Sequence, residues 1–320
     1  MQPTRVLLLF TLLACGAATA QPYPSKPVRV VMGFPPGTTV DVLMRPIAQR
    51  LTESLGQPLV LDNRPGATGI IATEMVVRAP ADGYTLLATP GSALTSSPHL
   101  HTKITFDTLR DLKPVIQIGA FAYVLIAHPG VPAKNVRELI TLARAKPGVL
   151  SYGSTGLGSG FHLAGELFRA MAKIELTHVP YKGGPAVVTD MLGGRIDLMF
   201  YSLAVVLPQI RADRLRAIAV TGLVRDPLLP EVPTVAESGL PKFEIGGWHG
   251  LFAPAATPNA VVMQLNTAIA RILATPEIKE LWTSQGMAVV SGGPEVFAAL
   301  VKSDYEKYGQ LIRSAGIKPE

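Results

Sequence analysis

Residues 33–41 read Gly-Phe-Pro-Pro-Gly-Thr-Thr-Val-Asp and stand between two segments of different periodicity. Residues 28–32 before them form an apolar run, and apolar residues recur every three or four positions from 42 to 51. This order predicts a strand, a tight turn and a helix. The turn carries no Lys, Arg or His, but its glycine, its threonine hydroxyls and the unpaired N–H groups of a helix start can hold an anion. Pro-Pro-Gly is also common in ordinary turns that bind nothing. This motif alone therefore leaves open whether the turn binds an anion.

A second glycine-rich junction lies at residues 154–160, which read Ser-Thr-Gly-Leu-Gly-Ser-Gly. A short strand at 150–152 precedes it and a helix follows from Phe161, so hydroxyl groups and glycine N–H groups again stand at a helix start. The third glycine of a dinucleotide fingerprint would fall on Phe161, no serine here sits in G-x-S-x-G, and no P-loop lysine follows. The junction is therefore an anion cradle or a tight turn, and two such junctions in one chain favour the anion-binding interpretation.

Predicted strands and helices alternate along most of the chain. Such alternation predicts the α/β class, with parallel strands covered on both faces. Ligands of these sheets collect beyond the carboxyl ends of the strands. Polar residues stand at two further strand ends: Thr89 and Ser92 in the first run, Tyr201 and Ser202 in the second. The predicted strands are 58–63, 84–89, 176–179, 196–200 and 215–220, and the predicted helices are 70–78, 136–145, 186–192 and 205–212.

The chain divides into two α/β runs. Two apolar segments, 115–118 and 123–127, have little between them and indicate a crossing from one domain into another. Residues 221–241 hold several prolines and, we expect, one short helix, whereas 248–253 return to the first domain and a helical pattern follows from 259. The predicted division is a signal peptide at 1–20, a first domain at 21–121, a second domain at 122–222, and a linker with a return to the first domain at 223–320.

Composition excludes several classes of protein. The chain has 320 residues, of which 48% are hydrophobic and 16% charged, so a sizeable core is available and disorder is not expected. Its net charge is +6, but the basic residues are spread thinly, without a Lys/Arg run or interleaved aromatics. Nucleic-acid binding is therefore not supported.

The N-terminus predicts export. Arg5 precedes a short apolar run, and Ala18-Thr19-Ala20 forms an A-x-A cleavage pattern, which is typical of a secretory signal peptide. Leu-Leu-Ala-Cys at 12–15 also resembles a lipobox, in which Cys15 would be acylated. Cleavage after Ala20 is favoured by its distance from the apolar run. The mature chain would then lack cysteine, which excludes disulfides, thiolate catalysis and Cys-ligated metals.

A series of short stretches resembles a known family, in order and through nearly the whole mature chain. The family is that of the Bug, or TctC-like, extracytoplasmic solute-binding proteins of tripartite tricarboxylate transport systems. The stretches are 23–29 (YPSKPVR), 34–37 (FPPG), 63–67 (NRPGA), 82–86 (DGYTL), 152–156 (YGSTG), 162–168 (HLAGELF), 179–184 (VPYKGG), 197–200 (DLMF), 215–221 (LRAIAVT) and 232–239 (VPTVAESG).

The resemblance implies a type II periplasmic-binding-protein fold, with two α/β domains, a hinge and a ligand cleft. It further implies a small carboxylate ligand, held between the FPPG loop and the loop at 154–156 by backbone and hydroxyl groups, and membrane subunits of a transporter as partners. We expect a periplasmic monomer without cofactor or metal. The expected ligand-binding residues are Phe34, Pro35, Gly37, Thr38, Thr39, Asp41, Thr89, Ser92, Ser154, Thr155, Gly156, Ser159, His162, Tyr201 and Ser202.

Two positions depart from the family pattern. The family often has glycine where this chain has Thr38, and an acidic residue where it has Tyr201. A carboxylate at the second position could pair with a ligand ammonium, so its absence favours an aromatic or aliphatic acid over an amino acid. Two members of the expected site have structural alternatives: Asp41 can serve the helix dipole, and His162 can be satisfied by the backbone.

Two other functions compete with transport. An enzyme on the same fold would need an activated nucleophile, and His162 near Ser159 is the only local base for one. A ligand-presenting sensor for a signalling receptor would need the same cleft. A metal pair at His99 and His101 is not expected, because no Cys or clear third ligand is near.

Overall fold

The computed structural model describes residues 23–181, 183–284, 286–290 and 292–319. The predicted signal peptide, with Cys15, lies outside the described residues. The fold is a mixed α/β architecture, as the alternation predicts, and its strands follow one another in the order β2-β1-β3-β9-β4-β7-β5-β6, with β8 also paired to β4. The strands are β1 (Val28–Met32), β2 (Leu59–Asn63), β3 (Thr85–Pro90), β4 (Leu112–Ala127), β5 (Ser151–Ser154), β6 (Thr177–Pro180), β7 (Leu198–Ser202), β8 (Arg216–Val220) and β9 (Gly246–Pro254).

The first half of the molecule is built on β1, which pairs in parallel with β2 and β3. β9 then joins β3 in the antiparallel sense, so the apolar run at 248–253 returns to the first sheet as predicted. Val30 and Met32 of β1 pack against Leu43 and Ile47 of the first helix in a fully buried cluster. The helical segments of this half are α1 (Thr39–Leu55), a 3₁₀ turn (Ala67–Gly69), α2 (Ile70–Val77), α3 (Ser92–Thr95), a second 3₁₀ turn (Ser97–His99) and α4 (Thr108–Asp111).

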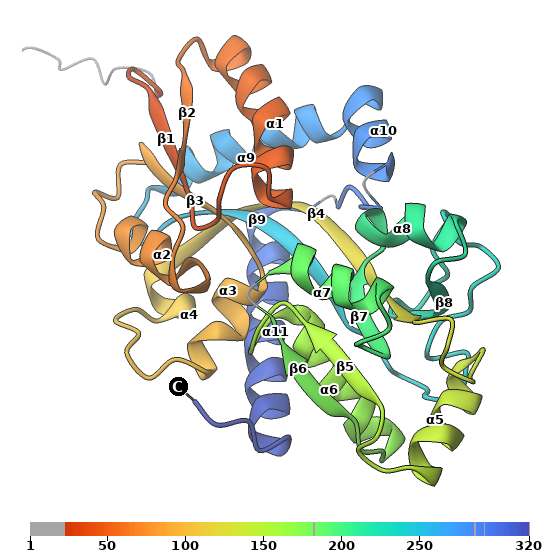
Figure 1. The fold of residues 1–320 in the computed structure, drawn as a ribbon. Coiled ribbons are helices and arrows are strands. Elements are labelled where there is room, and N and C mark those ends of the chain that lie inside the picture. The colour runs from red at the N-terminus through yellow and green to blue at the C-terminus, as the bar shows by residue number, and fades with distance from the viewer. Residues whose placement is uncertain (1–22, 182, 285, 291, 320) are drawn as a thin grey trace, which may run out of the picture.

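β4 is one long strand that crosses between the halves (Figure 1). It pairs with β9 from Leu112 to Ala122, with β7 from Tyr123 to Ala127, and with β8 from Val124 to Ala127. The sequence predicts two segments here, because Gly119 and Ala122 interrupt the apolar pattern. These small residues continue the ladder opposite β9, so the crossing is a single strand.

The second half carries parallel pairs of β5 with β6 and β7, and antiparallel pairs of β4 with β7 and β8. Asn135 caps its first helix as predicted, with its side chain accepting from the Glu138 N–H. Within the described residues 221–241 the chain forms turns and the expected short helix is absent, because recurring prolines withhold backbone N–H groups. The helices are α5 (Val136–Ala145), α6 (Gly160–Ala172), α7 (Gly184–Leu192) and α8 (Leu203–Arg211).

Three helices end the chain: α9 (Asn259–Leu273), α10 (Pro276–Ser284) and α11 (Pro294–Ser314). α11 runs along both halves (Figure 1). Phe297 packs in a core cluster of the first half, whereas Leu311 packs in the main cluster of the second. α11 thus belongs to both cores, although the predicted division assigns it to the first domain; the domain bounds stay a prediction. Within the described ranges, no helix has the length and apolar character needed to cross a membrane.

Candidate ligand-binding site

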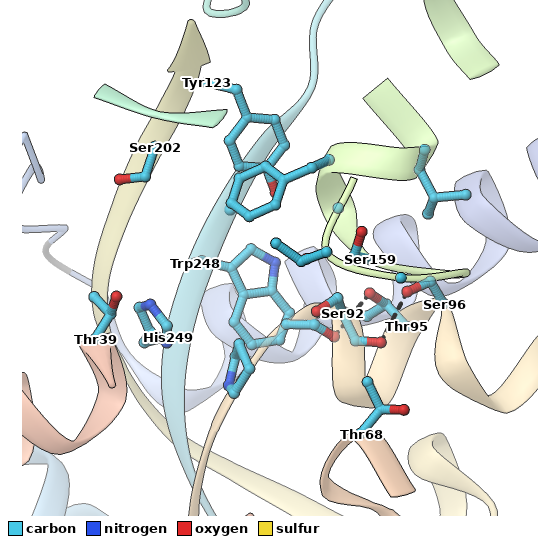
Figure 2. A pocket seen from close by; sticks show the side chains of 18 of the residues that line it. Thr39, Thr68, Ser92, Thr95, Ser96, Tyr123, Ser159, Ser202, Trp248 and His249 are labelled. Carbon is cyan, nitrogen blue, oxygen red and sulfur yellow. Dashed lines mark hydrogen bonds between the residues drawn. The ribbon is translucent and has the colours of Figure 1, made fainter. Parts of the chain in front are cut away.

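A cavity of about 530 Å³ lies between the two halves, at the carboxyl ends of strands β1, β3, β5 and β7 (Figure 2). Both glycine-rich junctions contribute to its wall, as do residues of β4 and β9. Each loop therefore approaches from the sheet edge at which α/β proteins bind ligands. The polar lining side chains include Thr38, Thr39, Thr68, Ser92, Thr95, Ser96, His101, Thr155, Ser159, Ser202 and His249.

The first junction is held from below by Asp41. The carboxylate is only 1% exposed, and its Oδ2 accepts from the Gly37 N–H at 2.9 Å and from Arg45 Nε at 2.9 Å. Burial alone would raise the pKa of Asp41, but these hydrogen bonds outweigh it and hold the pKa below its ordinary value. Asp41 thus has the structural role that its place in the first helical turn predicts. The first-turn N–H groups of Thr39 and Val40, two cavity-lining residues, have no intrahelical acceptor.

The loop after β3 links the two halves. The Ser96 hydroxyl lies 2.7 Å from the carbonyl of Gly158 in the second junction and 2.8 Å from the carbonyl of Ser92 (Figure 2). Thr95 donates to the Gly91 carbonyl at 2.9 Å. Sequence reasoning singled out Ser92 in this loop but missed Thr95 and Ser96. The signal available was their small polar character directly after a buried strand.

The second junction satisfies most of its polar groups internally. Ser154 is fully buried, and its hydroxyl shares a 2.7 Å hydrogen bond with His178 Nε2. Ser159 caps α6 by accepting from the His162 N–H at 3.2 Å, and His162 Nδ1 accepts from the Gly158 N–H at 3.1 Å. His162 is therefore satisfied by the backbone, as the structural alternative predicts. As in α1, the N–H groups of the first residues of α6, the cavity-lining Gly160 and Phe161, have no intrahelical acceptor.

A buried network supports this junction from behind. The His162 and His178 rings stack at 4.2 Å, and burial lowers the pKa of each to about 4, so both are neutral at pH 7. The Tyr152 hydroxyl donates to Glu166, which is also paired with Arg169. Sequence reasoning missed His178, because it lies 24 residues from the serine that it holds.

Aromatic rings form the apolar wall of the cavity. Phe161 lies 4.8 Å from Tyr123 and 4.6 Å from Tyr201, between ring centroids. A Cβ on Gly184 would stand 1.8 Å from the Tyr201 hydroxyl, so only glycine fits beside that ring. Trp248 both lines the cavity and packs in the core, and its Nε1 donates to Asp304 at 2.7 Å.

His249 is the unusual member of the lining. It lies on β9 between Trp248 and Gly250, its side chain is 5% exposed, and neither ring nitrogen has a hydrogen-bond partner among the described residues. The ring stacks on Phe121 at 5.7 Å with an interplanar angle of 17°. Burial lowers the pKa of His249 to about 4, so the imidazole is neutral at pH 7. Sequence reasoning missed this residue, although a histidine within an apolar strand was a visible signal.

Charged side chains are absent from the described lining: it contains no Asp, Glu, Lys or Arg. Lys182, which follows the lining residue Tyr181 in sequence, lies outside the described residues. In the described part of the chain no three His, Cys, Asp or Glu side chains gather as metal ligands would, and His99 Nε2 is bonded to the Tyr305 carbonyl at 2.9 Å. Binding here would therefore depend on neutral donors and helix dipoles.

The structure brings many of the expected site residues together and places the others behind them. Those that line the cavity are Phe34, Thr38, Thr39, Ser92, Thr155, Gly156, Ser159, Tyr201 and Ser202. Those outside the lining are Pro35, Gly37, Asp41, Thr89, Ser154 and His162. For the second group a supporting role is visible in Asp41, Ser154 and His162, and direct contact with a ligand stays a prediction.

Comparison with known proteins identifies relatives along the whole chain. The model of the tripartite tricarboxylate transporter family receptor matches residues 43–317. The "UPF0065 protein in tcbD-tcbE intergenic region" of a Pseudomonas species is 40% identical, covering 96% of this chain and 91% of that protein. Protein BugT of Bordetella pertussis is 35% identical, covering 99% of each. The resemblance to the Bug and TctC-like proteins is thereby confirmed.

Solved structures share the fold. "R. palustris Rpa4515 with adipate" superposes with a TM-score of 0.83 at 35% identity and covers 93% of this chain and 100% of its own. "MatC (Rpa3494) from Rhodopseudomonas palustris with bound malate" superposes with a TM-score of 0.79 at 29% identity, covering 91% of this chain and 100% of its own. The predicted fold class, that of the periplasmic binding proteins of this family, is confirmed by these neighbours.

Proposed function

Because the chain belongs to the tripartite tricarboxylate transporter receptor family, we propose that it is a periplasmic receptor that captures a small carboxylate in the cavity between its halves. The observation that carries this proposal is the convergence of two helix starts on one cavity. α1 begins at Thr39 and α6 at Gly160, and both residues line the wall, one from each half. The N-terminus of a helix presents free N–H groups and a positive dipole end, which favour an anion.

The charges around the cavity support an anion rather than a zwitterion. A ligand ammonium finds no carboxylate in the described lining, which weighs against amino acids. A carboxylate finds neutral donors and no fixed negative charge. The aromatic wall suits an apolar ligand body, and the related structures with adipate and malate make dicarboxylates the first candidates. The proposed ligand class is therefore a di- or tricarboxylate or an aromatic acid.

Capture would proceed by closure of the two halves on the ligand. A carboxylate that bridges the starts of α1 and α6 interacts with both halves only when they approach, so it stabilises the closed arrangement. The Ser96–Gly158 hydrogen bond and the Leu100 side chain beside Gly158 already join the segment after β3 to the second junction. The exported, monomeric protein would then present its closed form to the membrane subunits of a transporter.

A thermal-shift screen of the mature protein tests this proposal. The panel holds di- and tricarboxylates, aromatic acids and amino acids. A ligand at a hundred times its dissociation constant adds about 2.7 kcal/mol to the unfolding free energy, a shift of several degrees. We expect a shift with carboxylates and none with amino acids. The absence of a shift with every acid, in protein free of co-purified ligand, would refute the proposal.

A variant pair links the shift to the cavity. Thr155→Trp places a large side chain in the lining and should abolish the shift while the protein still unfolds cooperatively. Thr141→Trp makes the same change on the exposed face of α5 and should keep the shift. Equal shifts in both variants would show that the ligand binds at another site.

Trp248 provides a second readout. The sequence has two tryptophans, and the other, Trp282, is fully buried with its Nε1 donating to the Ile118 carbonyl. In a Trp282→Phe variant the emission comes from Trp248 alone, beside the cavity. We expect the acids that raise the melting temperature to change this emission in a saturable way.

A further inference from the structure

A third helix start reaches the cavity, in addition to those of α1 and α6. α7 begins at Gly184, directly after Gly183, which belongs to the cavity lining. Among the described residues no side chain caps this start, whereas Ser159 caps α6. The N–H groups of Gly184 and Ala186 have no intrahelical acceptor, and Pro185 between them has no N–H. The first turn of α7 therefore keeps free donors at the wall of the cavity.

The space in front of α7 is open. A Cβ on Gly183 would meet no described atom within 4 Å, and the φ of this residue is +127°, a conformation that suits glycine. The only acidic residue of α7, Asp190, stands six residues further on, about 9 Å along the helix. It is paired with Arg195 at 2.7 Å, so it does not occupy the helix start. The positive end of α7 is thus free to attract an anion.

The Tyr201 hydroxyl points to the same place. Tyr201 is 8% exposed and lines the cavity, and its hydroxyl fills the space that a Cβ on Gly184 would need. This hydroxyl has no hydrogen-bond partner within the described ranges, yet it is not one of the enclosed unpaired atoms, which belong to Arg169, His249 and Thr257. Its oxygen is therefore accessible from the cavity. Burial raises the pKa of Tyr201, so the hydroxyl keeps its proton at pH 7 and can donate.

The start of α7 is held close to the second junction. The Tyr181 N–H donates to the Ser154 carbonyl at 3.0 Å, which ties the segment before α7 to that junction. The Phe161 ring of α6 lies 4.6 Å from the Tyr201 ring, between centroids, so the first turn of α6 meets Tyr201 through an apolar group. Two helix starts with an apolar ring between them suit a ligand with two charged ends and an apolar body. Their fixed spacing lowers the entropy cost of binding such a ligand.

We propose that the start of α7 and the Tyr201 hydroxyl form a second carboxylate subsite, which makes the receptor select dicarboxylates over monocarboxylates. This inference rests on the proposed carboxylate-binding function and deepens it. One carboxylate binds at the starts of α1 and α6, and the other accepts from Tyr201 and from the N–H groups of α7. A ligand with an uncharged second end leaves these donors without an anion and binds more weakly for that reason.

Ligands that differ only at one end test the proposal on the wild-type protein. The dicarboxylates from succinate to pimelate are titrated into the mature protein by calorimetry, and the chain length that binds most tightly is chosen. Its monomethyl ester keeps the oxygens of the second end without the charge, and the fatty acid of the same length has neither. We expect the dissociation constants of the ester and of the fatty acid to be about tenfold or more above that of the dicarboxylate.

Tyr201→Phe removes only the hydroxyl of the proposed subsite. It should weaken dicarboxylate binding about tenfold and leave the affinity for the monomethyl ester nearly unchanged. Tyr305→Phe is the matched control, because Tyr305 lies outside the cavity lining and its hydroxyl also has no partner in the described part of the chain. This control should keep the affinities of all three ligands.

A change in the first turn of α7 tests the helix start itself. Ala186 is exposed at the third position of α7, where the carboxylate of a glutamate can reach back to the N–H at the helix start. Ala186→Glu should therefore keep or raise the melting temperature while it lowers dicarboxylate affinity. Ala186→Gln, of the same size but neutral, should lower this affinity less.

The outcomes separate this inference from the function on which it rests. Equal binding of the three ligands by the wild-type protein would overturn the second subsite and leave the receptor function in place. A preference for the dicarboxylate that persists undiminished in Tyr201→Phe and in Ala186→Glu would do the same, since another part of the cavity would then hold the second carboxylate. Failure of every carboxylate in the screen to bind would overturn both. The wild-type comparison needs no variant, so it holds even if a variant fails to fold.

Discussion

The two glycine-rich junctions bring the same kind of helix start to one cavity, yet they are supported in opposite ways. Behind the first junction lies an ionised carboxylate, Asp41, which holds the Gly37 N–H and pairs with Arg45. Behind the second lie the neutral imidazoles of His162 and His178. Asp41 lies in the first turn of α1 and, although Arg45 pairs with it, offsets part of the attraction of that helix start for an anion. The carboxylate behind the second junction, Glu166, is paired with Arg169 and stands one turn further along α6. We therefore expect the second junction to provide more of the anion binding, and the first to provide shape.

Acid should weaken the second junction before the first. We expect this effect to be larger than that of removing the Asp41 carboxylate or the Ser96 hydroxyl. The pKa values of His162 and His178 fall from the ordinary 6.5 to about 4 in the folded protein. A lowered histidine pKa gives stability that is complete above pH 6.5 and is lost as the pH falls towards 4. For a ring as buried as that of His162 this loss is on the order of 3 kcal/mol. Urea unfolding between pH 7 and 4 measures it.

Matched variants assign the acid effect to its junction. The stability profile of His178→Gln should be flatter between pH 6.5 and 4, because one titrating ring is gone. Asp41→Asn should leave that part of the profile unchanged, since the pKa of Asp41 lies below its ordinary 3.8. A profile that steepens or flattens equally in both variants would contradict the contrast between the junctions.

Removal of the Asp41 carboxylate should have the next largest effect. Asp41→Ala takes away the charged acceptor of the Gly37 N–H and of Arg45, and we expect the unfolding free energy to fall by about 2 kcal/mol. Asp41→Asn keeps an acceptor and should cost less. Calorimetric melting at pH 7 measures both. Wild-type melting temperatures for Asp41→Ala would show that the loop keeps its shape without this support.

Loss of the Ser96 hydroxyl should have the smallest effect, and it should appear in binding more than in stability. Its 2.7 Å hydrogen bond to the Gly158 carbonyl joins the halves. Ser96→Ala should weaken carboxylate affinity by about fivefold, the equivalent of one neutral hydrogen bond of about 1 kcal/mol. Ser54→Ala removes a similar hydroxyl from α1, where it donates to the Leu51 carbonyl, and should leave affinity unchanged. Equal affinities for the two variants would show that the Ser96–Gly158 hydrogen bond has no role in closure.

The parts of the fold that depend on local pattern could be predicted from the sequence. Each junction combines an apolar run, a glycine-rich turn and a helical period within a few residues. The sequence therefore predicts the strand, the turn and the helix around Thr39 and around Ser159. The continuity of β4 does not, because Gly119 and Ala122 interrupt its apolar run and are stabilised only by pairing with the distant strand β9. Residue patterns report on neighbours in the sequence, whereas the pairing of strands depends on residues that are distant in the sequence.

The same limit applies to the site. Thr38, Thr155 and Ser159 belong to local motifs and line the cavity as the motifs suggest. Ser154 belongs to one too, yet His178 holds its hydroxyl away from the lining. Burial of a hydroxyl or an imidazole depends on partners that the sequence does not place, so the free polar atoms of His249 could be recognised only in three dimensions.

The path of α11 along both halves has a consequence for how the chain folds. Phe297 completes a cluster in the first half and Leu311 completes one in the second, and β9, which joins β3 to β4, also comes late in the sequence. Neither half has its full core until the last helix has been synthesised. Contacts between distant parts of a chain slow folding, because loop closure must precede the gain from packing. The nascent chain therefore cannot complete either core before its C-terminal helix is available, which suits the export that we propose.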